Sequence, residues 1–276
     1  MADQTEEIPA PEEEEGDAES YKMPLLEHLI ELRRRLLYSI IALVVAFIAC
    51  YFVAEDIYNF LVRPLADLMA GQEGRRLIYT GLHEAFFTYL KVAFFGAAVI
   101  SFPIVAGQLW AFIAPGLYKN EKRAFLPFLI ATPVLFTLGA SLVYYLIFPL
   151  AWRFFLSFET TGGEGTLPIQ LEAKVNEYLS LVMKLIFAFG LSFQLPVILI
   201  LMARVGLVTS EGLARRRKYA IVITFLVAAI LTPPDLISQI GLGLPILALY
   251  EGSILAIKLV ERKRRASTED TAEADD

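Results

Sequence analysis

Long apolar blocks separated by short polar segments dominate the sequence. The six blocks cover approximately residues 36–54, 85–114, 124–148, 179–203, 219–231 and 237–257. A soluble domain spreads its apolar residues with the period of a helix or a strand, whereas continuous runs of about 20 apolar residues are typical of helices that cross a ~30 Å hydrocarbon core. The pattern therefore predicts an all-α integral membrane protein.

The fifth block, Tyr219 to Leu231, is short for a membrane span. At 1.5 Å per residue it is only ~20 Å long, and it is followed by the turn Thr232-Pro233-Pro234-Asp235, through which a helix does not easily continue. By length alone this block could be re-entrant rather than spanning.

The distribution of basic residues favours a full crossing for each block. Basic clusters flank alternate ends of the blocks, at Arg33–Arg35, at Lys119, Lys122 and Arg123, at Arg215–Lys218, and at Lys258 and Arg262–Arg265. Since cytoplasmic loops carry an excess of Lys and Arg, we expect six transmembrane helices with both termini in the cytoplasm.

Two amphipathic segments adjoin the first crossing. In residues 23–33 the leucines repeat at helical spacing opposite the charges, which predicts an interfacial helix that leads into the first span. Residues 56–69 predict a second one on the outer face. We expect that helix to break at Arg63-Pro64-Leu65, because proline has no amide hydrogen to donate.

The two ends of the chain differ from the body in charge. The net charge is −6, yet residues 1–20 contain nine acids and no base. We therefore expect a disordered acidic tail at 1–22, a six-helix transmembrane domain at 23–260, and a basic-then-acidic cytoplasmic tail at 261–276.

Catalytic and cofactor signatures are absent from the sequence. There are two histidines and one cysteine, Cys50, with no H-E-x-x-H zinc motif, no G-x-S-x-G and no phosphate-binding glycine loop. We expect no enzyme activity, cofactor, metal or nucleic-acid partner. We expect instead a receptor or conduit in the lipid bilayer, whose energy comes from the membrane gradient or from partners. An intramembrane hydrolase is disfavoured. A small-solute secondary transporter is the alternative, although no internal repeat supports it.

Four polar residues inside the apolar blocks require an explanation, because such groups are costly in lipid. Lys91 and Lys184 lie near the outer ends of their blocks, where snorkelling to the interface is the structural interpretation. Gln194 could either bond a neighbouring helix or satisfy the carbonyl that Pro196 leaves free. Glu251 lies in the sixth block, and its partner is unknown.

Two carboxylates on the predicted cytoplasmic side have both a structural and a functional interpretation. Glu31 is spaced to form an i,i+4 ion pair with Arg35, but it would also present a carboxylate beside an apolar surface. Glu121 lies in the short loop between the second and third blocks, either as a solvated charge or as a second binding carboxylate.

Four separated motifs resemble the TatC family, the signal-peptide receptors of the twin-arginine protein translocase. They are His28-Leu29-Ile30-Glu31-Leu32-Arg33-x-Arg35-Leu36, Trp110-Ala111-Phe112-Ile113-Ala114-Pro115-Gly116-Leu117-Tyr118-x-x-Glu121-x-Arg123, Phe189-Gly190-x-Ser192-Phe193-x-x-Pro196 and Thr232-Pro233-Pro234-Asp235-x-x-Ser238-Gln239. The resemblance covers roughly residues 23–260.

The resemblance implies a concave bundle of six helices in a bacterial inner membrane, with an organelle membrane as the alternative. It implies single-span partners of the TatA and TatB type, self-association, and folded cargo with an Arg-Arg signal peptide, moved by the proton-motive force. It places signal-peptide contacts at Glu31, Glu121, Phe112, Leu117 and Pro64. Candidate partner-facing polar residues within the membrane are Gln194, Asp235 and Gln239. Many members carry Glu where this chain has Gln194, so a proton-linked role is not expected at this position.

Overall fold

The computed structural model describes residues 14–70, 74–113, 122–163, 165, 167–204, 206–232 and 235–274. Within them the chain is helical apart from its connections, and no β-strand occurs beyond two isolated bridges. The elements are α1 (Glu14–Phe52), α2 (Ala54–Met69), α3 (Glu84–Ile113), α4 (Lys122–Leu142), the π-helical turn η2 (Val143–Ile147), α5 (Phe148–Leu156), α6 (Val175–Ser192), α7 (Leu195–Arg204), α8 (Ser210–Arg215), α9 (Arg217–Leu231) and α10 (Leu236–Ala274).

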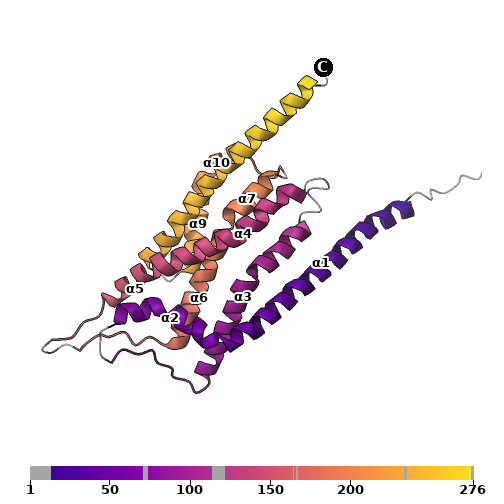
Figure 1. The fold of residues 1–276 in the computed structure, drawn as a ribbon. Helices are drawn as coiled ribbons and strands as arrows, with labels where there is room; N and C mark the ends of the chain where they lie inside the picture. Colours follow the sequence, from indigo (N-terminus) through magenta and orange to yellow (C-terminus); the bar gives the residue numbers. More distant parts are fainter. Residues whose placement is uncertain are drawn as a thin grey trace, which may run out of the picture.

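The long helices run side by side as a bundle (Figure 1). Helix α1 packs along α3, α4 packs on α6, and α10 packs on both α7 and α9. Helix α2 lies at the end of the bundle where the long connections gather, and the start of α1 and the end of α10 both project from the opposite end. We call these the α2 end and the α8 end, because the short helix α8 lies near the latter.

The apolar blocks of the sequence correspond to these helices. Among the described residues, five helical segments are long and apolar enough to cross a membrane, at residues 26–52, 84–112, 127–156, 175–204 and 236–262. The remaining block is α9, which has 15 residues. The expected all-α membrane fold is confirmed, whereas the count of six crossings stays a prediction.

The third span is longer than the sequence suggested. We expected it to end at Phe148, but η2 joins α4 to α5 and the helix continues to Leu156. Pro149 lies in the first turn of α5, where its missing amide hydrogen is tolerated. The π-helical turn shifts the hydrogen-bond register just before it, which is how a single-turn bulge accommodates an irregularity.

The expected break at Pro64 is wrong, because α2 runs through it without interruption. A proline inside a helix leaves the carbonyl four residues earlier without its amide donor, which here is the carbonyl of Phe60. The hydroxyl of Tyr144 donates to that oxygen at 2.7 Å. The next carbonyl, of Leu61, accepts from the hydroxyl of Tyr178 at 3.2 Å.

The fourth span is interrupted where we expected one helix. Helix α6 ends at Ser192 and α7 begins at Leu195, immediately before Pro196. The backbone amide of Gln194 tightens this join by donating to the carbonyl of Leu191 at 3.0 Å. The proline is then at the second position of a new helix, where no amide donor is required.

The described parts of the terminal segments are helical, and the domain bounds expected from the sequence stay predictions. The interfacial helix is not a separate element, because α1 is continuous from Glu14 to Phe52. Residues 14–22, expected to be disordered, are helical, and α10 continues to Ala274 through most of the expected C-terminal tail. Acidic residues stabilise a helix N-terminus, and Ala and Glu have high helix propensity, so neither segment opposes extension of the helix.

Small residues let α4 and α6 approach closely in the core. A Cβ atom added at Gly139 would lie 2.6 Å from the carbonyl oxygen of Phe189, and one added at Gly190 would lie 2.5 Å from the ring of Phe136. Close backbone approach at small residues is the usual way in which helices associate in lipid, where no hydrophobic driving force acts between them. Both Phe136 and Phe189 are buried at this contact.

Candidate functional site

An aromatic contact joins α1 to α3 near the α8 end. The ring of His28 stacks on the ring of Phe112, with centroids 4.2 Å apart and planes 19° apart. Phe112 lies in the last turn of α3. The contact therefore fixes the segment of α1 that carries the first motif against the helix end that carries the second.

Glu31 lies one turn after His28 on α1, so the two side chains share a helix face. Its Oε1 accepts two hydrogen bonds from Arg35, at 2.9 Å from Nε and 2.5 Å from Nη2. The two side chains are 32% and 24% exposed. The i,i+4 ion pair expected from the sequence is present, but it uses a single carboxylate oxygen and leaves the group within reach of a ligand.

Exposed apolar side chains occupy the faces of α1 next to the face that carries this carboxylate. Leu29, Ile30 and Leu32 are 59%, 66% and 42% exposed, and Leu26 is similarly exposed on the preceding turn. A carboxylate among exposed leucines is suited to a ligand that has both a cation and an apolar segment, because desolvation strengthens a charge-assisted hydrogen bond.

A buried polar chain holds the end of α3 in place. Trp110, two residues before Phe112, donates through Nε1 to Oγ1 of Thr132 on α4 at 3.0 Å. The same hydroxyl donates to the carbonyl of Phe128 at 2.8 Å. The carbonyl of Thr132 accepts from Nε2 of Gln194 at 3.0 Å. Thr132 thereby links α3, α4 and the α6–α7 join.

Gln194 bonds a neighbouring helix, which is the first of the two roles left open by the sequence. Its Nε2 also lies 3.4 Å from the carbonyl of Gly190, whose usual amide partner has moved to Leu191. The carbonyl that Pro196 leaves free belongs to Ser192, and Gln194 does not reach it in either bond. The Oε1 atom of Gln194 is buried without a hydrogen-bond partner among the described residues.

Asp235 and Gln239 lie together at the start of α10. Oδ1 of Asp235 accepts from the amide of Ser238 at 2.7 Å, which is the geometry of a helix N-cap. Its Oδ2 is buried and has no hydrogen-bond partner among the described residues. Nε2 of Gln239 approaches the carbonyl of Phe225 on α9 at 3.5 Å. Gln239 thereby joins α10 to α9 at the α2 end, whereas the bond of Asp235 stays within the first turn of α10.

Lys91, Lys184 and Glu251, the charged residues singled out inside the apolar blocks, have structural partners. Nζ of Lys91 donates to Oδ1 of Asn176 at 2.7 Å. Nζ of Lys184 donates to the carbonyl of Ile230 at 3.2 Å. The residue four positions later is Pro234, which has no amide hydrogen to donate to this carbonyl. Glu251 forms a two-pronged ion pair with Arg217, at 2.7 Å and 2.8 Å. Lys184 and Arg217 thus stabilise the two ends of α9.

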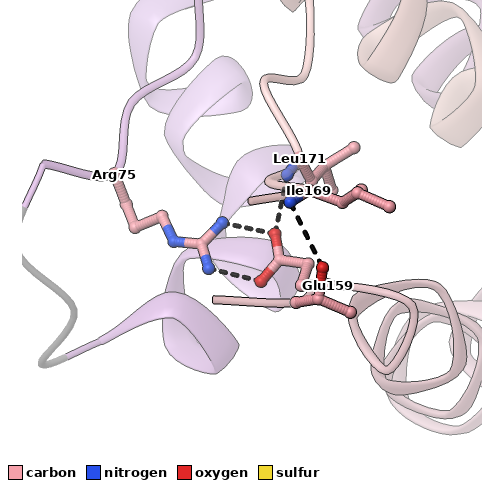
Figure 2. A network of polar contacts seen from close by, with 5 residues as sticks. Arg75, Glu159, Ile169 and Leu171 are labelled. Atoms are coloured by element: carbon pink, nitrogen blue, oxygen red, sulfur yellow. Dashed lines mark hydrogen bonds and ion pairs between the residues drawn. The ribbon is translucent and has the colours of Figure 1, made fainter. Parts of the chain in front are cut away.

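A polar clasp closes the connections at the α2 end (Figure 2). The guanidinium of Arg75 grips both carboxylate oxygens of Glu159, and Oε1 also accepts from the amide of Leu171 at 2.7 Å. These bonds lower the pKa of Glu159 to about 2. Thr160 and Ile169 pair through their backbones at 2.9 Å in both directions. Sequence reasoning missed this clasp, because its only local signal is the presence of opposite charges in two loops.

The structure brings some of the expected signal-peptide residues together and separates others. Glu31 and Phe112 lie on contacting segments, whereas Leu117 and Glu121 fall outside the described residues. Pro64 lies in α2, beyond the far end of α1, and Glu31 is roughly 30 Å from that end at 1.5 Å per residue. Pro64 is therefore not part of the same contact surface.

Comparison with known proteins places the chain in a family. The family model "Sec-independent protein translocase protein (TatC)" matches residues 27–245. The chain belongs to the TatC family. It is 51% identical over 243 residues to the Sec-independent protein translocase protein TatC of Magnetococcus marinus, covering 88% of this chain and 87% of that one. With the TatC of Escherichia coli strain K12 the identity is 40% over 228 residues, covering 83% and 85%.

Solved structures agree with this assignment. The crystal structure of the twin-arginine translocase receptor TatC in DDM superimposes with a TM-score of 0.72 at 36% identity, covering 83% of this chain and 99% of that one. A second crystal structure of the same receptor gives a TM-score of 0.70 at 37% identity. As a TatC family member, this chain is a non-enzymatic component of the Sec-independent protein translocase, with several membrane-spanning helices.

Proposed function

We propose that this TatC family member is the receptor of its translocase and binds the Arg-Arg signal peptides of folded proteins at the α8 end. The observation that carries the proposal is the stacking of His28 on Phe112 at 4.2 Å, because it sets Glu31 beside the helix end that leads into the second motif. In this orientation the α8 end faces the cytoplasm, both termini are cytoplasmic, and the six helices each cross the inner membrane once.

Chemistry favours an arginine pair as the ligand. A guanidinium is always charged and presents parallel donors that a carboxylate accepts in a fork, which a lysine ammonium cannot reproduce. Glu31 takes one arginine and Glu121 takes the other, while Phe112, Leu117 and the exposed leucines of α1 contact the apolar part of the signal peptide. Pro64 acts on the opposite side, by shaping α2.

Arg35 has a definite part in this proposal. It already places a guanidinium on Oε1 of Glu31 and leaves Oε2 without a hydrogen bond among the described residues. An incoming arginine binds Oε2 or replaces Arg35, which then turns to solvent. The resident pair keeps Glu31 oriented when no signal peptide is present.

We extend the proposal to the partner subunits. We assign Gln194, Asp235 and Gln239 to contacts with a single-span partner of the TatA or TatB type. Gln194 and Asp235 are only 6% and 7% exposed in the isolated chain, so such a partner has to displace neighbouring side chains to reach them. The buried oxygens of Gln194 and Asp235 without hydrogen-bond partners support this assignment, because an unpaired buried polar atom is costly and a partner that donates to it relieves that cost. The proton-motive force drives transport once these partners assemble.

The test is signal-peptide affinity in nanodiscs for Glu31→Ala, Glu121→Ala and the double variant, each with Arg-Arg and Lys-Lys peptides. A charge-assisted contact contributes ~1.5–3 kcal/mol, so each single change should weaken Arg-Arg binding roughly tenfold to a hundredfold. Glu31→Lys should be weaker than Glu31→Ala because it adds repulsion. Full affinity with retained Arg-Arg preference in both single variants would show that other residues select the arginine pair.

A matched control separates loss of a contact from loss of fold. Glu211→Ala removes a carboxylate that is also paired at i,i+4, with Arg215 at 3.2 Å, on a different helix at the same end. This pair is more than 80% exposed, so its loss should leave both folding and peptide affinity unchanged.

A further inference from the structure

An apolar groove outside the signal-peptide site lies between α7, α9 and α10. Its volume is about 410 Å³, within the ~300–1,000 Å³ typical of small-ligand sites. Its walls include Ile198, Ile223 and Ile246. No residue proposed to bind the signal peptide or a partner subunit lines it.

The groove opens to the surroundings of the bundle rather than to its core. Leu191, Ile198 and Ile223 are 53%, 43% and 58% exposed. Leu191 and Ile198 belong to the candidate span 175–204, and Ile223 belongs to α9, which crosses the membrane in the proposed function. The medium that meets them is therefore hydrocarbon, and a flexible apolar chain is the natural occupant.

The mouth of the groove is basic. Arg216 and Tyr219 line it, next to Arg215, Arg217 and Lys218 in the sequence. Arg215 pairs with Glu211 and Arg217 pairs with Glu251. Among the described residues no carboxylate lies within ion-pair distance of Arg216. Arg216, which lines the mouth, therefore differs from its neighbours Arg215 and Arg217 in having no acidic partner among the described residues.

The groove has the length of one leaflet. From Arg216 to Val227, both in its lining, α9 rises roughly 16 Å at 1.5 Å per residue. Half of a ~30 Å hydrocarbon core is ~15 Å. A lipid with its phosphate at the level of Arg216 therefore places an acyl chain along the whole groove.

We propose that this groove binds one anionic phosphoglycerolipid, with an acyl chain between α7, α9 and α10 and the phosphate on Arg216. Basic pockets between spans on the cytoplasmic side favour anionic headgroups. A transmembrane helix is ~10–12 Å across and can lie over a groove of this volume but not inside it. The crossing of the membrane by α9 and the name of the leaflet, cytoplasmic, rest on the proposed function.

Native mass spectrometry of the full chain tests the proposal. The protein in detergent is titrated with dioleoyl phosphatidylglycerol and, separately, with dioleoyl phosphatidylcholine, which has the same chains and no net charge. We expect one tightly retained phosphatidylglycerol. Arg216→Gln should lower its affinity about fivefold and leave phosphatidylcholine binding unchanged. Ala220→Leu, which narrows the groove, should lower the affinity for both lipids.

Arg215→Gln is the matched control, because it removes the same charge from the adjacent position outside the groove. Equal losses in Arg215→Gln and Arg216→Gln would overturn the proposal in favour of diffuse surface attraction. Unchanged binding in Ala220→Leu, with the variant shown to be folded by its thermal midpoint, would overturn the acyl position. Competition by inorganic phosphate would show an ion site without a lipid.

The result is independent of the receptor assignment. The same preparations are assayed for Arg-Arg peptide binding, which involves residues of α1, of α3 and of the connection after α3, and none in the groove. Loss of lipid selectivity with normal peptide binding would refute the lipid site alone. Displacement of the retained lipid by a single-span partner would show that a helix is the true occupant.

Discussion

The hydroxyl of Tyr144 donates a hydrogen bond of 2.7 Å to the backbone carbonyl of Phe60, and the two aromatic rings stack at 4.4 Å. The acceptor is the carbonyl that Pro64 leaves without a helical donor. A backbone carbonyl without a donor is costly when helices pack over it, and here a side chain from a neighbouring helix supplies the bond. This explains how α2 continues through a proline.

The first prediction concerns this bond. Tyr144→Phe keeps the ring stacking but leaves the carbonyl of Phe60 unpaired, which should destabilise the protein by roughly 1–3 kcal/mol. Pro64→Ala restores an amide donor to the same carbonyl, so Tyr144→Phe should cost clearly less in that background. Thermal unfolding of the four proteins in detergent measures the coupling. Equal costs in the two backgrounds would mean that the hydroxyl does not compensate for the proline.

The second prediction concerns Arg35. If it competes with the signal peptide for Glu31, Arg35→Gln should strengthen Arg-Arg peptide binding by up to about fivefold, since an i,i+4 ion pair near the surface is worth up to ~1 kcal/mol. Arg63→Gln, at the α2 end in a long 3.9 Å pair with Asp67, is the control and should have no effect. A large loss of affinity in Arg35→Gln would instead make Arg35 a direct contact of the peptide.

The third prediction is a pH dependence of the clasp between Arg75 and Glu159. The pKa of Glu159 is lowered to about 2, first by the hydrogen bonds from Arg75 and then by the amide of Leu171. Because the folded pKa lies below the ordinary value of 4.5, the stabilisation is fully present above pH ~4.5 and is lost as the pH falls toward 2.

Hydrogen exchange of residues 74–83 and 157–174 between pH 6 and pH 3 measures this opening, after correction for intrinsic exchange rates. Glu159→Gln should show faster exchange in these segments at pH 6 and little further change on acidification. Protection that does not change with pH in the wild type would show that the clasp does not hold the connections together.

The fourth prediction concerns Gln194. Its Nε2 donates to the carbonyl of Thr132, so Gln194→Leu should cost ~1 kcal/mol and weaken partner recovery modestly. A carboxyl group at this position replaces the donor only when it carries a proton. Gln194→Glu should therefore be tolerated at pH 5 and have a lower thermal midpoint at pH 8, whereas the wild type changes little. Unchanged partner recovery and transport in Gln194→Leu would reduce the residue to a filler at the α6–α7 join.

The fifth prediction concerns the length of α9. With 15 residues it rises ~22 Å against a ~30 Å core, so the bilayer is expected to thin beside it. The side chain of Leu236, just beyond the end of α9, is 72% exposed. In a Cys50→Ala background, Leu236→Cys should therefore react with a membrane-impermeant thiol reagent added on the side of α2. Labelling only from the side of α8 would refute both the thinning and the six-crossing topology.

The sequence predicts the helices of this protein well and their contacts poorly. An apolar block of span length is enough to predict a helix, because every backbone hydrogen bond of a membrane helix is made within its own segment. The π-helical turn at Val143–Ile147 and the continuity of α2 depend on side chains far along the chain, such as Tyr144 for Phe60. The sequence shows that Pro64 needs an external donor, but not which hydroxyl provides it.

The candidate site was predicted to a similar degree. The spacing of Glu31 and Arg35 is enough to predict their ion pair, because the geometry is local to one helix. The stacking of His28 on Phe112 and the pairing of Arg217 with Glu251 cross between helices, so no local pattern specifies them. The two roles left open for Gln194 could be separated only by the position of Thr132 on α4.

The near absence of burial along the first span has a consequence for biogenesis. Only 6% of its most apolar window, within residues 26–52, is buried against the rest of the protein. Such a helix is held in the bilayer by its own partition into lipid, so it can be inserted as soon as it leaves the ribosome, before any later segment exists. Helix α9 lacks that independence, since it is short and its ends are stabilised by Lys184 and by Glu251. The chain is therefore expected to enter the membrane in two modes, with α1 inserting alone and α9 entering as a hairpin with α10 onto a scaffold already in place.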